Sequence, residues 1–199
     1  MKVYGLTGKS GAGKSTVAGM LFQKGFFVID GDKVARSITE KGSPILQVLA
    51  NRFGKDILID GMLDRHKLAE RAFADKSSTD ALNRITHPEI DRLFKLQIEQ
   101  AKQAGFEYCI IDAAALLESP SKALCEKIIV VDAPEKLRLE RILSRDKISL
   151  EQAMTRIKAQ KKDEYYLSSA DIIIRNYPPY ILQDELDRAV ACLKGVITE

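Results

Sequence analysis

The sequence predicts an α/β fold in which a parallel five-stranded sheet lies between layers of helices. Five short apolar runs, several of them rich in Val and Ile, have the length of strands, and segments with helical periodicity separate them. Alternation of this kind is typical of a parallel sheet that is covered on both faces. A glycine-rich loop directly follows the first run. The five runs are Lys2–Leu6, Phe26–Ile29, Tyr108–Asp112, Lys127–Val131 and Asp171–Ile174.

Length and composition limit the classes of protein to consider. The chain has 199 residues, enough for one compact α/β domain with a modest insertion, and 45% of them are hydrophobic. A net charge of +3 is too weak and too dispersed to suggest a nucleic-acid binder. The three cysteines, Cys109, Cys125 and Cys192, show no pairing pattern or metal-ligand spacing, which fits a reducing compartment. No apolar stretch reaches membrane-spanning length, so we expect a cytoplasmic protein without membrane partners. We also expect a monomer or weak oligomer and no nucleic-acid partner.

Helical blocks fill the spaces between the predicted strands. Residues 33–105 read as mostly helical and are too long for a simple crossover, which predicts an insertion at the carboxyl edge of the sheet. Within it, Thr86-His87-Pro88-Glu89 resembles a capping box that starts a helix, and Gly105 resembles its stop. A helical pair is expected over about 134–163, with its second helix starting near Ser149 and Gln152, and a final helix over about 179–194. The core then comprises about 1–32, 106–133 and 164–199.

The loop after the first strand carries a phosphate-binding pattern. Residues 8–15 read GKSGAGKS and fit G-x-x-x-x-G-K-[ST]. Glycines let successive backbone N–H groups point at a phosphate, and the helix that follows adds positive potential. Lys14 is expected to reach the β- and γ-phosphates, and the Ser15 hydroxyl to bind Mg²⁺. The expected nucleotide-binding residues of this P-loop are Gly8, Gly11, Ala12, Gly13, Lys14, Ser15 and Thr16.

A chance glycine-rich turn is the alternative to this interpretation. Chance matches rarely follow a buried strand near the start of an α/β chain and also open a helix. Here Val17, Met20 and Leu21 give the following helix an apolar face. The context therefore favours a triphosphate-binding loop in a P-loop NTPase fold.

A P-loop alone does not identify the acceptor of the phosphate. Neither D-x-x-G nor N-K-x-D, which small GTPases carry, occurs in the chain. A short chain with a helical insertion and a helical lid, here 134–163, suggests a small-molecule kinase, because a lid keeps water from the activated phosphate. Two alternatives remain open: a kinase of the nucleoside monophosphate type and a non-catalytic nucleotide-binding regulator.

Two carboxylates follow the second predicted strand. Asp30 and Asp32 are two residues apart, so on an extended segment they would face the same side, at the carboxyl edge of the sheet. A carboxylate there can accept a proton from an attacking hydroxyl or help to position Mg²⁺. The alternative is that one of them, Asp30 more readily than Asp32, caps the next helix.

The ordered series of motifs resembles the dephospho-coenzyme A kinase family over about nine tenths of the chain. The family phosphorylates the ribose 3′-hydroxyl of dephospho-CoA with ATP, which makes ATP, Mg²⁺ and dephospho-CoA the implied cofactors and substrate. The P-loop is generic, but the later elements are specific as a set. The matching segments read GLTGKSGAGKST, VIDGDKVAR, DGMLDRHKLAERAF, THPEI, DAAALLE, VVDAPEKLRLERILSRD, AQ at 159–160, and ADIIIRN.

This resemblance implies roles for individual residues. Asp32 becomes the base for the acceptor hydroxyl, and insertion 33–105 becomes the acceptor-binding part, with Arg36, Arg65 and His87 near the substrate. Arg141 becomes a catalytic lid arginine; Arg145 and Asn176 become nucleotide-binding residues, Asn176 near the adenine. Without the resemblance, Arg138, Arg141 and Arg145 read as a solvated helix stripe, His87 as a capping or surface residue, and Asp112 as either a strand-end turn residue or an acid that acts on the metal indirectly.

The chain also departs from the family pattern. Lys9 stands where the family usually has glycine. Two alternatives are open for this added cation: its side chain contacts a phosphate of the nucleotide, or it points away from the phosphates. Ala114 and Ala115 replace the proline and leucine of the loop after the third strand. Tyr177-Pro178-Pro179 replaces a glycine after Asn176, which bears on the adenine contact.

Overall fold

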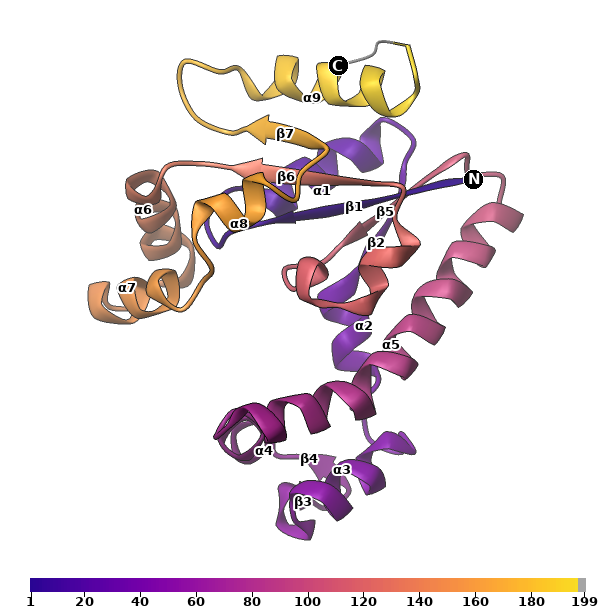
Figure 1. The fold of residues 1–199 in the computed structure, drawn as a ribbon, viewed down its shortest axis with the longest axis vertical. Helices are drawn as coiled ribbons and strands as arrows, with labels where there is room; N and C mark the ends of the chain where they lie inside the picture. The colour runs from indigo at the N-terminus through magenta and orange to yellow at the C-terminus, as the bar shows by residue number, and fades with distance from the viewer. Residues whose placement is uncertain (197–199) are drawn as a thin grey trace. The chain divides into compact units, whose positions relative to one another are not determined.

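A computed structural model describes residues 1–196 of the protein, which form two compact units (Figure 1). The first unit comprises Met1–Ile29 and the chain from Ala101 onward. The second unit is Asp30–Gln100.

A five-stranded sheet with the order β2-β5-β1-β6-β7 is the centre of the first unit (Figure 1). β1 pairs in parallel with both β5 and β6, and β6 pairs in parallel with β7, so the sheet is mostly parallel. The predicted strands are confirmed, because each predicted run overlaps one of these. The strands are β1 (Lys2–Gly8), β2 (Phe27–Asp30), β5 (Tyr108–Asp112), β6 (Lys127–Asp132) and β7 (Ile172–Arg175).

Helices cover both faces of this sheet. On one face, α1 (Lys14–Gln23) and α9 (Leu182–Leu193) pack Val17, Leu21 and Leu186 against strand residues such as Leu6 and Ile129, all fully buried. On the other face, next to Gly5 of β1, lie the short 3₁₀ helices η2 (Leu116–Glu118) and η3 (Pro120–Leu124). The three-layer α/β architecture is therefore as the sequence predicts.

Three helices follow β6, namely α6 (Glu135–Asp146), α7 (Leu150–Lys158) and α8 (Asp163–Leu167). α7 starts as predicted. The Ser149 hydroxyl accepts a hydrogen bond from the Gln152 N–H at 3.2 Å, and Gln152 Oε1 accepts one from the Ser149 N–H at 3.0 Å, which together form a capping box.

The second unit is mostly helical, with one small hairpin that the sequence reading does not predict. β3 (Leu58–Ile59) and β4 (Met62–Leu63) pair antiparallel through Asp60 and Gly61, whose φ angles are 51° and 76°. An Asp-Gly pair with positive φ is the usual two-residue hairpin turn. The helices are α2 (Gly31–Ser37), α3 (Ile45–Phe53), η1 (Lys55–Ile57), α4 (Arg65–Ala72) and α5 (Lys76–Gln103).

The predicted helix start at residues 86–89 is wrong. α5 runs without a break from Lys76 to Gln103 and contains Pro88 in its interior. The Thr86 hydroxyl donates to the Leu82 carbonyl at 2.9 Å, one turn back, so it does not cap a helix. The predicted stop holds: α5 ends at Gln103, and Gly105 follows with a φ of 86°.

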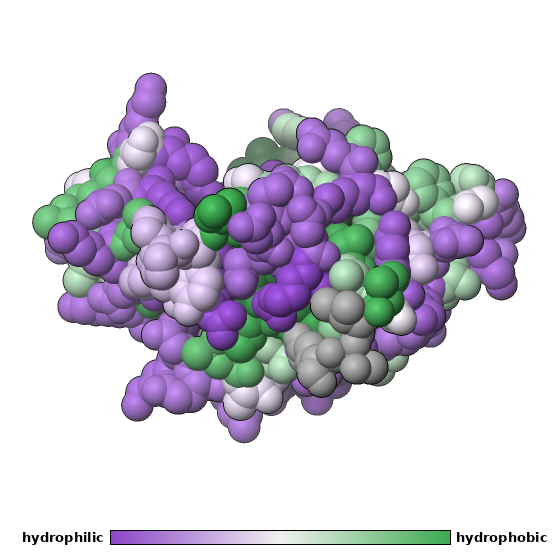
Figure 2. All heavy atoms as spheres, turned by 90° about the horizontal axis from the view of Figure 1, so that it is seen from above, coloured by the Kyte–Doolittle hydropathy of each residue, from purple (hydrophilic) through white to green (hydrophobic). Residues whose placement is uncertain are grey.

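Hydrophilic side chains cover most of the face shown in Figure 2, and hydrophobic residues appear there in separate patches. Large hydrophobic side chains that are exposed include Phe22, Tyr180 and Ile181. Within residues 1–196, no helix has both the length and the apolar character needed to cross a membrane.

Candidate active site

The glycine-rich loop connects β1 to α1 in the first unit. Gly11 and Gly13 have φ angles of 80° and 100°, which side-chain-bearing residues rarely adopt. A Cβ atom on Gly11 would lie 2.5 Å from the Arg138 carbonyl oxygen, and one on Gly13 would overlap the Asn176 side chain. Gly13 caps α1, so the N–H groups of Lys14 and Ser15 belong to the first turn, which has no intrahelical acceptors. The loop is thus shaped to present donors to an anion.

Lys14 forms an ion pair with Asp112 through its Nζ atom. Asp112 ends β5, and the parallel register pairs it with Leu6 of β1, two residues before the loop begins. Both side chains are largely buried, with 15% and 13% of their surfaces exposed. The sheet therefore places a carboxylate beside the lysine of the loop.

Arg141 of α6 reaches the same loop. Its guanidinium donates to the carbonyl oxygens of Gly11 and Ala12, both at 3.2 Å, and to that of Asn176 at 2.8 Å. The Asn176 Nδ2 atom donates to the Ala12 carbonyl at 2.8 Å. Arg141, Asn176 and the loop are thus brought together, although they are far apart in the sequence.

Arg145 has a different environment. Its Nε and Nη2 atoms donate to the carboxylate of the adjacent Asp146 at 2.7 and 3.1 Å, and the side chain is 61% exposed. Arg156 of α7 pairs with the same carboxylate. Hydrogen bonds from Arg145 hold the pKa of Asp146 below its usual value. The structure therefore separates the two predicted lid arginines: Arg141 contacts the loop, and Arg145 pairs with a neighbouring acid.

Asp30 and Asp32 do not lie on one extended segment, so that part of the prediction is wrong. α2 begins at Gly31 because Asp30 caps it: Asp30 Oδ1 accepts from the Lys33 N–H at 2.9 Å. Asp32 lies in the first turn of α2. The alternative interpretation, in which Asp30 caps the next helix, is confirmed. Asp32 does not cap α2, and its role as a base stays a prediction.

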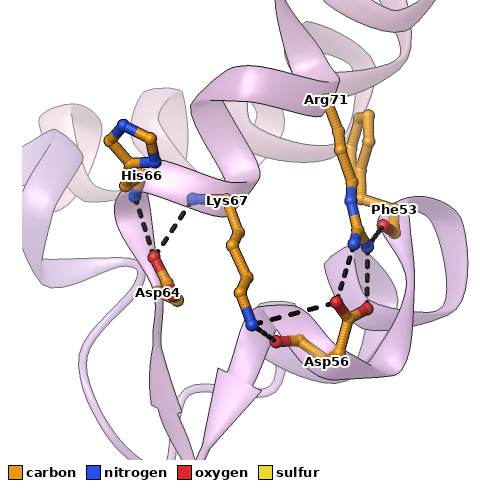
Figure 3. Close-up of polar contacts among 6 residues, drawn as sticks. All are labelled: Phe53, Asp56, Asp64, His66, Lys67 and Arg71. Atoms are coloured by element: carbon orange, nitrogen blue, oxygen red, sulfur yellow. Dashed lines mark hydrogen bonds and ion pairs between the residues drawn. The ribbon is translucent and has the colours of Figure 1, made fainter.

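Two of the predicted acceptor residues meet within the second unit. Arg65 Nη2 donates to the carbonyl oxygen of Arg36 at 3.4 Å, which connects the start of α4 to the last turn of α2. α4 starts at Arg65 because Asp64 caps it, accepting from the N–H groups of His66 and Lys67 (Figure 3). The third predicted residue, His87, is on a separate element, α5.

A second set of contacts fixes α4 against the preceding segment (Figure 3). Arg71 donates to both oxygens of the Asp56 carboxylate, at 2.8 and 2.7 Å, and to the Phe53 carbonyl at 2.6 Å. These hydrogen bonds lower the pKa of Asp56. Gly54 has a φ of 105°, which favours glycine, and a Cβ there would also overlap the Arg71 guanidinium. These hydrogen bonds hold α4, the helix that begins at Arg65, against the segment from Phe53 to Asp56.

Comparison with known proteins identifies the family. A family model described as Dephospho-CoA kinase matches residues 2–179. A Bacillus licheniformis protein named Dephospho-CoA kinase is 39% identical over 175 residues, which cover 87% of each chain. The chain belongs to the dephospho-CoA kinase family.

Solved structures agree with membership of the dephospho-CoA kinase family. The dephospho-CoA kinase from Campylobacter jejuni superposes with a TM-score of 0.70 at 30% identity, over 99% of this chain and 100% of that one. A crystal structure of a Thermus thermophilus protein gives a TM-score of 0.80 at 27% identity, over 100% and 98%. The resemblance read from the sequence motifs is confirmed.

Two departures from the dephospho-CoA kinase pattern have defined surroundings. Lys9 points to α8, where its Nζ atom pairs with Asp163 and lies 5.8 Å from the centre of the Tyr166 ring. In the loop after β7, the rings of Tyr177 and Tyr180 meet edge to face at 5.2 Å, and the Arg175 guanidinium lies 5.1 Å from the Tyr180 ring. Both departures are therefore packed against neighbouring residues of the first unit.

Two polar residues next to the loop have contacts that the sequence does not predict. Gln160 Oε1 accepts from the Ser10 N–H at 3.3 Å and from Arg138 Nη1 at 3.4 Å. Arg138 is 1% exposed and also donates to the Ala133 carbonyl at 3.0 Å, so it is no part of a solvated stripe. The match of Ala159-Gln160 to a family motif was the available signal for Gln160; nothing local marked Arg138 as buried.

Proposed function

We propose that this chain transfers the γ-phosphoryl group of ATP to the ribose 3′-hydroxyl of dephospho-CoA, giving coenzyme A and ADP. The proposal depends on the contacts of the glycine-rich loop in a chain that belongs to this family. The loop has the complete G-x-x-x-x-G-K-S sequence, Lys14 pairs with Asp112, and Arg141 donates to the carbonyl oxygens of the loop. We further propose a cytoplasmic protein, monomeric or weakly oligomeric.

Nucleotide binding in this proposal depends on the loop. N–H groups of the loop, such as those of Lys14 and Ser15 in the first turn of α1, donate to the phosphates, and Lys14 exchanges its contact with Asp112 for the β- and γ-phosphates. Asn176 lies next to the nucleotide, toward its adenine. Arg141 turns from the loop carbonyls to the transferring phosphoryl group, and Arg145 leaves Asp146 for phosphate oxygens as the lid, residues 134–163, closes.

The residues beside the loop fit a magnesium ion. Ser15 offers a hydroxyl oxygen at the start of α1, and Asp112 offers a carboxylate at the end of β5. Mg²⁺ prefers hard oxygen donors and keeps several waters when it binds phosphates, so few protein ligands are needed. We assign Ser15 as the direct ligand and Asp112 as an acid that acts through a water. When bound, the ion neutralises charge on the β- and γ-phosphates.

Acceptor binding in this proposal belongs to the second unit. Arg36 and Arg65 supply positive charge for the phosphates of dephospho-CoA, and His87 supplies a further contact. Asp32 accepts the proton of the 3′-hydroxyl while the hydroxyl oxygen bonds to the γ-phosphorus and the bond to the ADP oxygen breaks. A neutral hydroxyl needs such a base, whereas a phosphate acceptor does not, which favours this reaction over a nucleoside monophosphate kinase.

A direct assay tests the proposal. ADP release is measured with dephospho-CoA, AMP, adenosine and a panel of sugars, and the product is analysed by mass spectrometry for one added phosphate on the ribose. We expect turnover with dephospho-CoA alone. Turnover only with AMP or a sugar would overturn the acceptor, and ATP binding without any turnover would indicate a nucleotide-binding regulator.

A further inference from the structure

Lys9 is a cation inside the phosphate-binding loop that does not face the phosphate site. Its side chain is only 12% exposed, although it is a lysine in a loop. Its ammonium pairs with Asp163 in the first turn of α8 and lies 5.8 Å from the Tyr166 ring. Lysine is rarely buried to this extent unless it is paired, so the contact fixes its direction.

A second acid, Asp132, interacts electrostatically with both members of this ion pair. Asp132 ends β6, and its pKa is raised by burial and by the charge of Asp163, while Lys9 and Arg138 lower it. Lys9 thus contacts one carboxylate and one aromatic ring, and its charge acts on the buried Asp132, all in the first unit. This is a built environment for one positive charge, and removal of that charge would leave Asp132 and Asp163 in mutual repulsion.

The neighbouring loop residue is attached to the same segment. Ser10 N–H donates to Gln160 Oε1 at 3.3 Å, and Gln160 Nε2 donates to Ser10 Oγ at 3.4 Å. Two consecutive loop residues, Lys9 and Ser10, are therefore joined to residues 160–163. On the opposite side, Arg141 and Asn176 hold the carbonyls of Gly11 and Ala12. The loop is fixed from both sides before any nucleotide arrives.

We propose that Lys9 is a positioning residue for nucleotide binding, which acts through Asp163 to hold the phosphate-binding loop open in its cradle shape. The inference rests on the proposed function only in that the loop binds ATP. A preformed loop spares the nucleotide the cost of ordering the backbone, so the ion pair contributes to affinity without contact between Lys9 and phosphate.

In the competing role, Lys9 pairs with Asp163 only in the absence of nucleotide and binds a phosphate directly when nucleotide is present. The two roles differ in the effect of Asp163→Asn. Removal of a negative charge near the site favours a bound anion by long-range electrostatics, and it would also release a stored lysine; both effects would tighten nucleotide binding. If Lys9 positions the loop through Asp163, the same change weakens binding instead.

The experiment measures the Kd of ADP, with magnesium, by isothermal titration calorimetry for the full chain and for Lys9→Met, Asp163→Asn and the double variant. We expect each single change to raise Kd roughly three- to tenfold, and the double variant to be no worse than the singles, as for residues that act as one pair. In steady-state assays with dephospho-CoA, KM for ATP should rise while kcat at saturating ATP stays within about twofold of wild type.

The ion pair of Lys24 with Asp187 provides the matched control. It is of the same type, has a similarly exposed carboxylate (52% against 58%), and connects the end of α1 to α9, away from the loop. Lys24→Met and Asp187→Asn should leave the Kd of ADP unchanged. The charge-swapped variant Lys9→Asp with Asp163→Lys should recover part of the lost affinity. A thermal unfolding curve for each variant shows whether it is folded.

Several results would overturn the inference: tighter ADP binding in Asp163→Asn, additive losses in the double variant, or losses no larger than those of the Lys24 and Asp187 controls. These outcomes do not depend on the acceptor. A wild-type protein that binds ADP but does not phosphorylate dephospho-CoA would contradict the proposed function and leave the Kd comparison valid.

Discussion

The ammonium of Lys14 pairs with the carboxylate of Asp112, and this contact joins the glycine-rich loop to the end of the neighbouring strand β5. The register pairs Asp112 with Leu6 of β1, and the loop that follows β1 returns Lys14, the first residue of α1, to the same carboxylate. The pair gives the loop lysine a counter-charge that a triphosphate can replace.

The Lys14–Asp112 pair predicts unequal effects of its two members. Lys14→Met should lower kcat by about 10²–10³-fold, since it removes charge that stabilises the transferring phosphoryl group. Asp112→Asn should cause a smaller loss, with a higher magnesium requirement. Both are measured as initial rates of ADP release over a magnesium titration. Equal rates in Lys14→Met and in the distant Lys24→Met would contradict the assignment.

Asp32 is predicted to act on turnover and not on binding. Asp32→Asn should reduce kcat by about 10²–10⁴-fold, the usual contribution of a general base, while the affinities for ATP and dephospho-CoA are largely kept. Asp30→Asn is the neighbouring control, because Asp30 caps α2 and asparagine caps a helix nearly as well. Near-normal turnover in Asp32→Asn would remove Asp32 from the role of base.

Gly13 and Gly19 make a matched pair within one segment. Gly13 has a φ of 100°, and a Cβ there would overlap Asn176, whereas Gly19 is inside α1 with no atom within 4 Å of an added Cβ. Gly13→Ala should cost at least about 1–2 kcal/mol of unfolding free energy from the backbone conformation alone. Gly19→Ala should be neutral or stabilise by up to about 1 kcal/mol. Urea denaturation of the two variants checks the difference.

Asp132 predicts a dependence of stability on pH. Burial raises its pKa in the folded state, so the folded protein binds this proton more tightly than the unfolded chain. The protonated form therefore favours folding below the unfolded pKa of about 4, and this contribution is lost as pH rises through the folded pKa. Asp132→Asn should raise the Tm at pH 7 and have less effect near pH 4.

A carboxylate with the opposite shift gives the control for Asp132. A hydrogen bond from Lys24 lowers the pKa of Asp187, so its contribution is present above the unfolded pKa and is lost as pH falls. Asp187→Asn should then not raise the Tm at pH 7. A lower Tm for Asp132→Asn at neutral pH would show that its other contacts outweigh the cost of burying its charge.

The parts of the fold that were predictable depend on local signals. Runs of Val and Ile mark the buried strands, and Ser149 with Gln152 marks a helix start through contacts three residues apart. The same kind of signal failed at Thr86, because Pro88 is tolerated inside the long helix α5 and the Thr86 hydroxyl bonds backward. The Asp60-Gly61 pair is a local signal for a hairpin turn, and the structure has one there.

The parts of the site that escaped prediction depend on distant partners. The loop pattern and the family motifs pointed to Lys14, Asp112, Arg141 and Asn176, which the structure brings together in pairs. Nothing near Lys9 in the sequence indicates that its partner is Asp163. The burial of Arg138 likewise depends on Gln160, so its position on a helix stripe with Arg141 was uninformative.

Arg138 has a consequence for how residues 134–163 can move. Its buried guanidinium donates to the Ala133 carbonyl, where this segment leaves the sheet, and to Gln160 Oε1, just after α7. The Arg138 side chain thus connects Ala133, before α6, to Gln160, just after α7. A movement of α6 and α7 that keeps these two hydrogen bonds would leave Ala133 and Gln160 in place and displace the far ends of the two helices.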